Sequence, residues 1–187
     1  MPGNLLKKIG YWCWRLKTFY HFKVYGPYGV SNCIEVMPYP YIIPIMRLYG
    51  ARIGEKCGIE RGLILHRPDP QRPFKNLTIG NRVYIGHSVI IDLTETVNIG
   101  NHCAFGAACQ LWTHTGDWTL TRADEHEQTG PVSIGEAVII YSGSIVTQGV
   151  AIGNYARIGA GSVVLNNVEE KSFFAGNPAK YIRNRDF

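Results

Sequence analysis

An aliphatic or small residue recurs at every sixth position along the second half of this chain. The longest series runs without a slip through Ile134, Ile140, Val146, Ile152, Ile158 and Val164. The same spacing occurs earlier, in shorter stretches that begin at Ile53, Ile79 and Ile99. A period of six fits neither an α-helix, which repeats at about 3.6 residues, nor a single strand, which alternates at every second residue. It predicts short strands that turn a corner every six residues and stack coil upon coil.

The residue types fit such a solenoid. The large aliphatic side chains point into a narrow interior, where each buried Val, Leu or Ile contributes roughly 1.5–3 kcal/mol. A glycine often follows, as at Gly135, Gly153 and Gly159, because positive φ or a close backbone approach near a corner suits glycine best. Successive coils then pair as parallel strands. The predicted fold class is therefore all-β, a parallel β-solenoid.

Three interruptions break the period. The first, between Leu65 and Ile79, is too rich in proline to continue a strand, and the second is a slip of two residues between Val97 and Ile99. The largest, over 112–133, is predicted to project as a loop. Loops on a rigid scaffold usually carry function, and this one holds His114, Asp117, Trp118, Arg122, Asp124, Glu125 and His126.

Residues 4–23 show a different pattern, which predicts an amphipathic helix. Its apolar stripe comprises Leu5, Ile9, Trp12, Leu16 and Phe19. One interpretation is a cap over the open end of the solenoid, since terminal coils need protected edges. The other is a helix that docks on a partner or peripherally on a membrane, because tryptophan and basic side chains suit a lipid interface.

Four prolines between residues 24 and 50 favour an extended connector to the first coil. The expected organisation is a helix and connector over 1–50, then a solenoid domain over 51–187 with a C-terminal tail at 168–187.

Composition narrows the function classes. A length of 187 residues suits one domain, and the net charge of +5 suits an anionic ligand. Scattered Lys and Arg residues argue against nucleic acid as a partner. The five cysteines form no Cys-x-x-Cys pair and are expected to be free buried thiols. No signal peptide or long apolar run is found, so we expect a cytoplasmic protein, placed at the inner membrane surface if the helix at 4–23 binds lipid.

Two strings near the end of the chain resemble a known family. Residues 152–164 read Ile-Gly-Asn-Tyr-Ala-Arg-Ile-Gly-Ala-Gly-Ser-Val-Val, and residues 175–183 read Ala-Gly-Asn-Pro-Ala-Lys-Tyr-Ile-Arg. They resemble the end of the hexapeptide acyltransferases, above all the maltose, galactoside and colanic-acid-type O-acetyltransferases. The resemblance covers roughly Ile53 to Arg183. It implies a left-handed parallel β-helix of triangular cross-section, acetyl-CoA as acyl donor without a metal, and a homotrimer with each active site between two subunits.

The implied reaction moves an acetyl group to a hydroxyl or an amine. A neutral hydroxyl is a poor nucleophile at neutral pH, so a positioned base is needed, and His titrates in the right range. In the resembling enzymes the catalytic His begins the projecting loop. Here an ungapped alignment puts Gly116 at that position and His114 two residues earlier, a shift that keeps the side chain on the same face of an extended segment. We therefore expect His114 to be the base; His87, His126 and a purely surface role for His114 stay open.

The resemblance also implies binding residues. For the acceptor, His87 stands where the family has an Asn, Asp92 matches an Asp that binds hydroxyls or orients a base, and Asp117 is a candidate to orient the imidazole or to grip a sugar. For the donor, the matching residues are Ser142 and Ala160 along the pantetheine arm and Lys180 and Arg183 near the phosphates. The plainer alternatives are a corner role for Asp92 and solvated charges for Lys180 and Arg183.

The expected acceptor is a hydroxyl of a sugar or glycan intermediate. Three alternatives stay open: an N-acetyltransferase acting on an amino sugar, a non-catalytic scaffold, and a γ-type carbonic anhydrase. The carbonic anhydrase needs three imidazoles around zinc, and the His-x-x-x-x-His pair of that group is absent among His66, His87, His102, His114 and His126.

Overall fold

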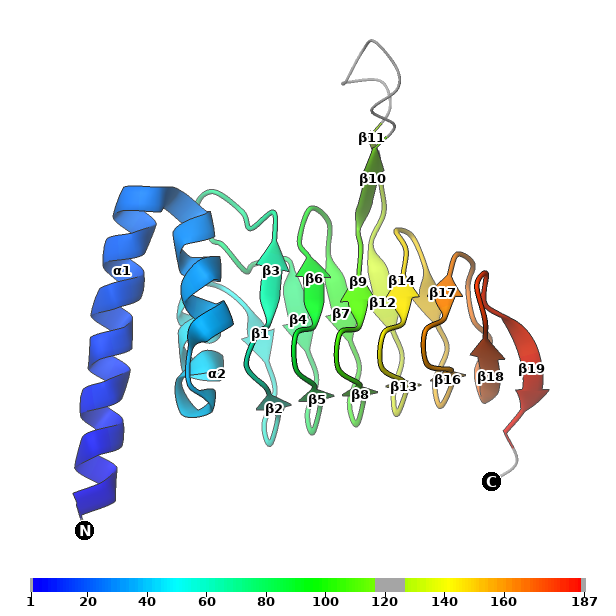
Figure 1. The fold of residues 1–187 in the computed structure, drawn as a ribbon, viewed down its shortest axis with the longest axis horizontal. Helices are drawn as coiled ribbons and strands as arrows, with labels where there is room; N and C mark the ends of the chain where they lie inside the picture. Colours follow the sequence, from blue (N-terminus) through cyan, green and yellow to red (C-terminus); the bar gives the residue numbers. More distant parts are fainter. Residues whose placement is uncertain (1, 117–126, 186–187) are drawn as a thin grey trace.

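The computed structural model describes the backbone of residues 2–116 and 127–185, and the side chains of 5–116 and 128–185. Two helices precede short strands that wind into a coil and form three sheets along it (Figure 1). The first sheet holds β1 (Arg52–Ile53), β4 (Leu77–Ile79), β7 (Val97–Ile99), β12 (Val132–Ile134) and β15 (Ala151–Ile152). The second holds β2 (Gly58–Ile59), β5 (Tyr84–Ile85), β8 (Ala104–Phe105), β13 (Ile139–Ile140), β16 (Arg157–Ile158), β18 (Ser172–Ala175) and β19 (Lys180–Asn184). The third holds β3 (Ile64–His66), β6 (Ile90–Asp92), β9 (Gln110–Leu111), β14 (Ile145–Val146) and β17 (Val163–Val164).

The six-residue series forms the core of this coil. Strands of successive coils pair in parallel, and within these three sheets β19 is the strand that runs antiparallel, on β18. In the third sheet the paired core residues are Leu65, Ile91, Leu111, Val146 and Val164. Each of them is at most 1% exposed, so the predicted inward direction of the series is confirmed.

Close packing between coils explains the glycine that follows many core residues. A Cβ on Gly80 would lie 2.8 Å from the backbone N of Asn101 in the next coil, closer than side chains tolerate. Positive φ occurs at this same corner, for example at Arg82 (φ 54°) and His102 (φ 61°), and also at the corner that follows the strands of the second sheet. There Ser88 (φ 56°) and Ala108 (φ 57°) occupy equivalent positions on neighbouring coils.

The segment before the first coil is more helical than the sequence predicted. α1 (Pro2–Val36) and α2 (Tyr39–Leu48) occupy most of the range 24–50, so the expected extended connector is wrong. Most of the prolines lie at helix starts here, because the first turn of a helix has N–H groups that need no partner in the helix; Pro44 is the exception and lies inside α2. Pro27 follows the interruption of α1 at Gly26, and a proline also lies at the start of α2.

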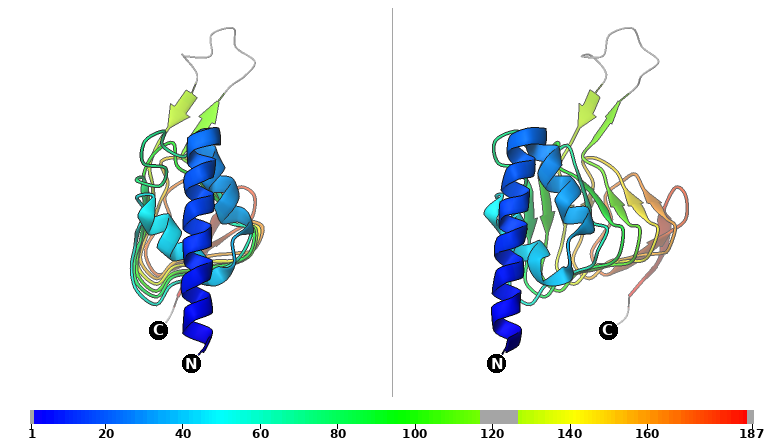
Figure 2. Two further views of the ribbon diagram at one scale, coloured as in Figure 1. Left: turned by 90° about the vertical axis from the view of Figure 1, so that its left-hand side faces the viewer. Right: turned by 60° about the vertical axis from the view of Figure 1, so that its left-hand side comes forward.

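Both helices lie across the end of the coil that begins with β1 (Figures 1 and 2). Their inner side chains, which include Val30, Ile34, Ile42 and Met46, are fully buried, and the Ser31 hydroxyl donates a hydrogen bond to the Leu65 carbonyl. No helix among the described residues is long and apolar enough to cross a bilayer.

The five cysteines are all free thiols, and four of them are buried as expected. Cys13 is the exception: it lies exposed on α1, where the helix turns part of its surface away from α2 and the coil.

The largest interruption leaves the coil as a hairpin. After β9 the chain forms β10 (His114–Gly116), which pairs antiparallel with β11 (Glu127–Thr129) before the chain re-enters the coil at β12. Figure 1 shows this hairpin rising from the side of the solenoid. His114 is therefore the first residue of a strand that is anchored to the third coil.

Candidate active site

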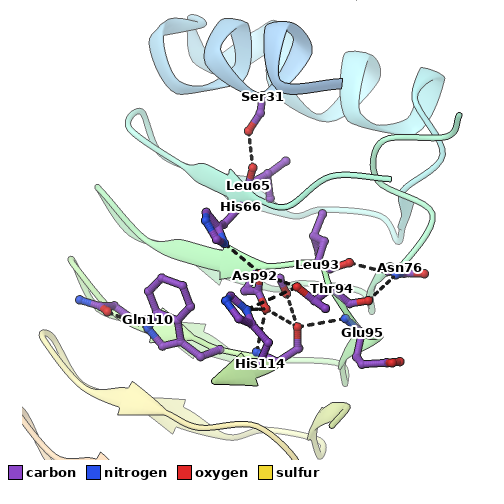
Figure 3. Close-up of polar contacts among 12 residues, drawn as sticks. Ser31, Leu65, His66, Asn76, Asp92, Leu93, Thr94, Glu95, Gln110 and His114 are labelled. Carbon is purple, nitrogen blue, oxygen red and sulfur yellow. Dashed lines mark hydrogen bonds and ion pairs between the residues drawn. The ribbon is translucent and has the colours of Figure 1, made fainter. Parts of the chain in front are cut away.

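A buried carboxylate forms the centre of the site. Asp92 ends β6, and its side chain is completely shielded from solvent. Its Oδ2 accepts hydrogen bonds from His114 Nδ1 at 2.8 Å, from the Thr113 backbone N–H at 3.0 Å and from the Thr113 hydroxyl. Its Oδ1 accepts from His66 Nδ1 at 3.0 Å and from the Thr94 hydroxyl at 3.1 Å. Figure 3 shows His66, Thr94 and His114 around the Asp92 side chain.

The hydrogen bonds decide the ionisation of Asp92. Burial by itself would raise the pKa of this carboxyl, because a charge is poorly solvated away from water. Donors on His114, Thr113 and His66 outweigh burial and hold the pKa of Asp92 below its usual range. The carboxylate is therefore ionised at neutral pH, and both imidazoles donate to it through Nδ1.

The residue before His114 fixes the position of His114 in the chain. Thr113 is fully buried, and its hydroxyl oxygen accepts a hydrogen bond from the Glu95 backbone N–H at 3.0 Å, which ties the start of the hairpin to the preceding coil. The His114 side chain is 15% exposed. With Nδ1 donating to Asp92, Nε2 is the basic atom of the ring, as a general base requires.

His66 is the member of this site that sequence reasoning missed. It ends β3, and its register partner in β6 is Asp92. Its ring stacks on the His114 ring with centroids 5.5 Å apart and planes at 12°, and the Trp112 ring meets both of them edge-on. Two imidazoles thus lie side by side with their Nδ1 atoms on opposite oxygens of one carboxylate.

A signal for His66 was present in the sequence. His66 follows Leu65, Asp92 follows Ile91, and these two core residues pair in register. Reading each coil from its own first core residue would have aligned His66 with Asp92. The proline-rich interruption that follows Leu65 hid this alignment, because it shifts the six-residue count of everything after it.

Among the residues that the structure describes, His66, Asp92 and His114 also form the group that could hold a metal ion. Ligand atoms of His66, Asp92 and His114 lie within 4.8 Å of one another, and imidazole with carboxylate is a common donor set for zinc or iron. The carboxylate already accepts four side-chain donors here, and among the described side chains no buried polar atom lacks a partner. The group is therefore satisfied as a hydrogen-bonded cluster.

The other predicted acceptor residues do not join this cluster within one chain. His87 lies in the turn between β5 and β6, its side chain is 64% exposed, and its Nε2 is 3.8 Å from Glu60 Oε2. Asp117 and His126 lie outside the described residues.

The predicted donor residues Ser142 and Ala160 share a corner with His87. All three follow strands of the second sheet by two residues, on different coils. The Gly161 N–H donates to the Ser142 carbonyl at 2.9 Å, and the side chains at this corner are exposed. His114 belongs to the next corner, beyond the third sheet, so one chain carries these two groups on separate edges.

The predicted basic residues lie at the C-terminal end of the coil. Lys180 begins β19 and is exposed. Arg183 lines a shallow cavity together with two further arginines and two aromatic residues: Arg157, Arg185, Tyr141 and Phe173. Burial, followed by the positive charge of Arg185, lowers the pKa of Arg157. Such a gathering of guanidinium groups favours an anion, and sequence reasoning had named only Arg183 from it.

Comparison with known proteins agrees with this architecture. The family described as bacterial transferase hexapeptide (six repeats) matches residues 131–166. The putative colanic acid biosynthesis acetyltransferase WcaF of Escherichia coli (strain K12) is 29% identical over 143 residues, which are 75% of this chain and 73% of that protein. The putative acetyltransferase YJL218W of Saccharomyces cerevisiae is 36% identical over 110 residues, 58% of this chain and 56% of that protein.

Solved structures show the same fold. The hexapeptide-repeat-containing acetyltransferase VCA0836 of Vibrio cholerae superposes with a TM-score of 0.74 at 21% identity, covering 84% of this chain and 87% of that one. Galactoside acetyltransferase in complex with coenzyme A superposes with a TM-score of 0.69 at 23% identity, covering 79% and 71%. The predicted left-handed parallel β-helix is confirmed by this likeness.

Proposed function

We propose that this chain, which matches the hexapeptide transferase family over residues 131–166 and shares the fold of hexapeptide-repeat acetyltransferases, transfers an acetyl group from acetyl-CoA to a hydroxyl of a sugar or glycan intermediate. The observation that carries the proposal is the pair of His114 and Asp92, joined at 2.8 Å with the carboxylate buried. It supplies the general base that the reaction needs, at the foot of the projecting hairpin.

The chemistry follows from this pair. His114 Nε2 removes the proton of the acceptor hydroxyl as its oxygen attacks the thioester carbonyl. The tetrahedral intermediate then collapses, the C–S bond breaks, and the CoA thiolate takes the proton back from His114. Asp92 holds Nδ1–H throughout and stabilises the imidazolium that forms between the two proton transfers. His66 acts through Asp92, because its Nδ1–H keeps the second carboxylate oxygen in place.

A homotrimer would bring the separate edges of the chain together. His114 lies on one corner, and His87, Ser142 and Ala160 lie on another. We place the acceptor between the His114 corner of one subunit and the His87 corner of its neighbour, with the pantetheine arm along Ser142 and Ala160. The arginine cavity that includes Arg183 is then the site proposed for the CoA phosphates, with Lys180 beside it.

The sugar class of the acceptor is supported by the relatives. WcaF carries the description of a colanic acid biosynthesis acetyltransferase, and the superposed structures include galactoside acetyltransferase and a maltose O-acetyltransferase from Clostridium difficile 630. The closely packed imidazoles and the neighbouring Trp112 suit a sugar, since sugar hydroxyls need hydrogen-bond partners and sugar faces pack on aromatic rings.

The test is release of CoA thiol from acetyl-CoA in the presence of a panel of mono- and disaccharides. His114→Ala should lower kcat by roughly 10²–10⁴-fold, the usual contribution of a general base. His102→Ala is the matched control, because His102 is an exposed corner residue on another edge, and it should keep full activity. The proposal fails if no sugar acceptor releases thiol, or if His114→Ala turns over like the unmodified protein.

A further inference from the structure

Helix α1 carries an apolar surface that nothing in the chain covers. Leu5, Ile9, Trp12, Leu16 and Phe19 follow one another at intervals of four and three residues, so they form one continuous stripe. Their exposed fractions run from 50% for Ile9 to 66% for Leu16. We call these five residues the outer stripe.

Each side chain of the outer stripe is at least half exposed, although Trp12, Leu16 and Phe19 also line a groove against Leu48, Tyr49 and Pro73. The opposite side of α1 is the one that packs: Thr18 is buried, Trp14 packs on the core, and the Phe22 ring meets the Tyr49 ring of the α2 C-terminus at 5.8 Å. The left view of Figure 2 shows α1 in front of the rest of the molecule, lying across its end. The stripe therefore points outward from the end of the coil.

The charge of the helix identifies what fits there. Residues 1–34 contain five Lys and Arg residues and no Asp or Glu, so this segment alone carries a charge equal to the net charge of +5 of the whole chain. Three of these cations lie over aromatic rings: Arg15 on Trp12 at 4.8 Å, Lys17 on Trp14 at 4.7 Å and Lys23 on Phe19 at 5.7 Å. Apolar side chains flanked only by cations match a bilayer with anionic headgroups.

A groove beside the stripe has the same character. Its lining combines apolar and aromatic side chains with cations: Trp12, Arg15, Leu16, Phe19, Phe22, Lys23, Leu48, Tyr49, Gln71, Arg72 and Pro73. Arg72 comes from the segment between β3 and β4 and adds a third cation to this lining. An acyl chain or a headgroup entering here would meet both apolar side chains and guanidinium or ammonium groups.

A second copy of the chain is the rival occupant, because intervals of four and three residues are also those of a coiled-coil seam. Lys8 and Arg15 flank the seam one heptad apart. Two such helices would place cation against cation, with no acidic residue between positions 1 and 34 of either helix to compensate. The charge pattern therefore disfavours a second copy and favours an anionic surface.

We propose that the outer stripe binds the surface of a bilayer containing anionic lipids, with α1 lying in the plane of the interface. The docked protein then stands with the end of its coil against the membrane. His66, Asp92 and His114 come from the first three coils, and neighbouring coils are about 4.8 Å apart, so the candidate site would lie close to the lipid surface. That last point rests on the proposed acetyl transfer, whereas the binding itself does not.

Vesicle sedimentation of the full chain tests the proposal. Vesicles of phosphatidylcholine alone are compared with vesicles containing one quarter phosphatidylglycerol, at low and at high salt. The protein should sediment with the anionic vesicles and be released by salt. Leu16→Glu should lower the partition coefficient at least about tenfold. The control is Leu165→Glu, another exposed leucine (51%) on the solenoid, which should bind as the unmodified protein does.

Two further measurements separate the possible outcomes. Replacing Lys8 and Arg15 together by Gln should weaken binding by roughly 25-fold, at about fivefold per charge, and an environment-sensitive dye on the exposed Cys13 should report entry into a less polar layer. The idea is overturned if the chain ignores anionic vesicles, or if Leu16→Glu binds them unchanged. A fall in oligomer mass on Leu16→Glu, without vesicle binding by the parent chain, would also overturn it and assign the stripe to a second copy. These readouts do not depend on acetyl transfer.

Discussion

Asp92 organises the candidate site through the number of donors it accepts. A buried carboxylate without partners would be neutral, since burial alone disfavours its charge. The donors from His66, Thr94, Thr113 and His114 reverse that outcome. The negative charge that results can fix the tautomer of two imidazoles and stabilise the positive charge that forms during proton transfer.

The charge of Asp92 also predicts a pH dependence of stability. Its pKa is lower in the folded than in the unfolded chain, so its contribution is fully present above the unfolded value of about 3.9 and is lost as the pH falls through the folded value. We expect the urea midpoint to fall more steeply on acidification for the parent chain than for Asp92→Asn. The pKa of Asp69 is also lowered, to about 2, by the Arg72 N–H and Lys75. Because Asp69 is present in both proteins, its contribution to the slope cancels in this comparison. Equal slopes would contradict the assignment.

His66 can be tested as a positioning residue. His66→Leu removes the donor to Asp92 Oδ1 and should lower kcat by roughly tenfold, the lower end for groups that orient a functional side chain, with KM values for donor and acceptor unchanged. His66→Asn keeps an N–H at the position of Nδ1 and should restore most of kcat. If Asn and Leu are equally impaired, His66 does not act through this hydrogen bond.

At the scale of single residues, the sequence predicted part of the candidate site. His114 could be named because it begins the largest interruption, where the resembling enzymes carry their catalytic His, and Asp92 because the segment around it resembles one that bears an Asp. His66 was missed, because the proline-rich insertion after it shifts the six-residue count, although counting from the first core residue of each coil aligns it with Asp92. The arginines that surround Arg183 were equally hidden, since Arg157 comes from a wall strand whose outward face has no periodic signal of its own.

Among the elements, the solenoid was predictable and the N-terminal helices were not. Each coil repeats the same local requirement for a core residue and a small neighbour, so the sequence carries the same signal many times. The segment 24–50 has no repeating pattern, and its prolines are compatible either with an extended connector or with the starts of helices. Burial of the apolar faces of α2 and of the end of α1 against the first coil stabilises the helical conformation.

Gly26 is the residue on which the shape of α1 depends. It has φ 65° and ψ −157°, a region open essentially to glycine alone, where other residues are strained by about 1–3 kcal/mol. No atom lies within 4 Å of where its Cβ would be, so Gly26→Ala introduces strain without a clash. We expect a free energy of unfolding lower by about that amount, followed by tryptophan fluorescence, since Trp12 and Trp14 lie on α1.

The control for this substitution is Gly161→Ala. Gly161 has φ 65° and equally open surroundings, but other coils carry Ser88 and Ala108 at this corner. The change should therefore lower stability by only about 1 kcal/mol or less. A larger loss at Gly161 than at Gly26 would show that the interruption of α1 is not a strained feature.

For the whole molecule, the proposed donor site predicts that acetyl-CoA stabilises the fold. Acetyl-CoA at about 100 times its Kd should stabilise the fold by about 2.7 kcal/mol, which for a domain of this size raises Tm by roughly 5–10 °C. Arg183→Ala should raise the KM for acetyl-CoA about tenfold, the scale of one charge-assisted hydrogen bond, with little change in kcat. Arg52→Ala, an exposed arginine on the first coil, should leave both the Tm shift and the KM unchanged. Equal effects of the two substitutions would remove the arginine cavity from the donor site.

The order of the coils has a consequence for what the protein can accept. The base enters with the third coil, and the arginine cavity is completed by β18 and β19, beyond two further full turns made by β12 to β17. Each turn advances by about 4.8 Å, so with the proposed donor site the number of turns between His114 and the arginine cavity sets the distance that a CoA thioester has to span. Duplicating the 18-residue segment 132–149 would add one turn to this distance while the pairing between neighbouring coils is kept. We expect such a chain to fold, to bind CoA, and to leave the thioester short of the imidazole.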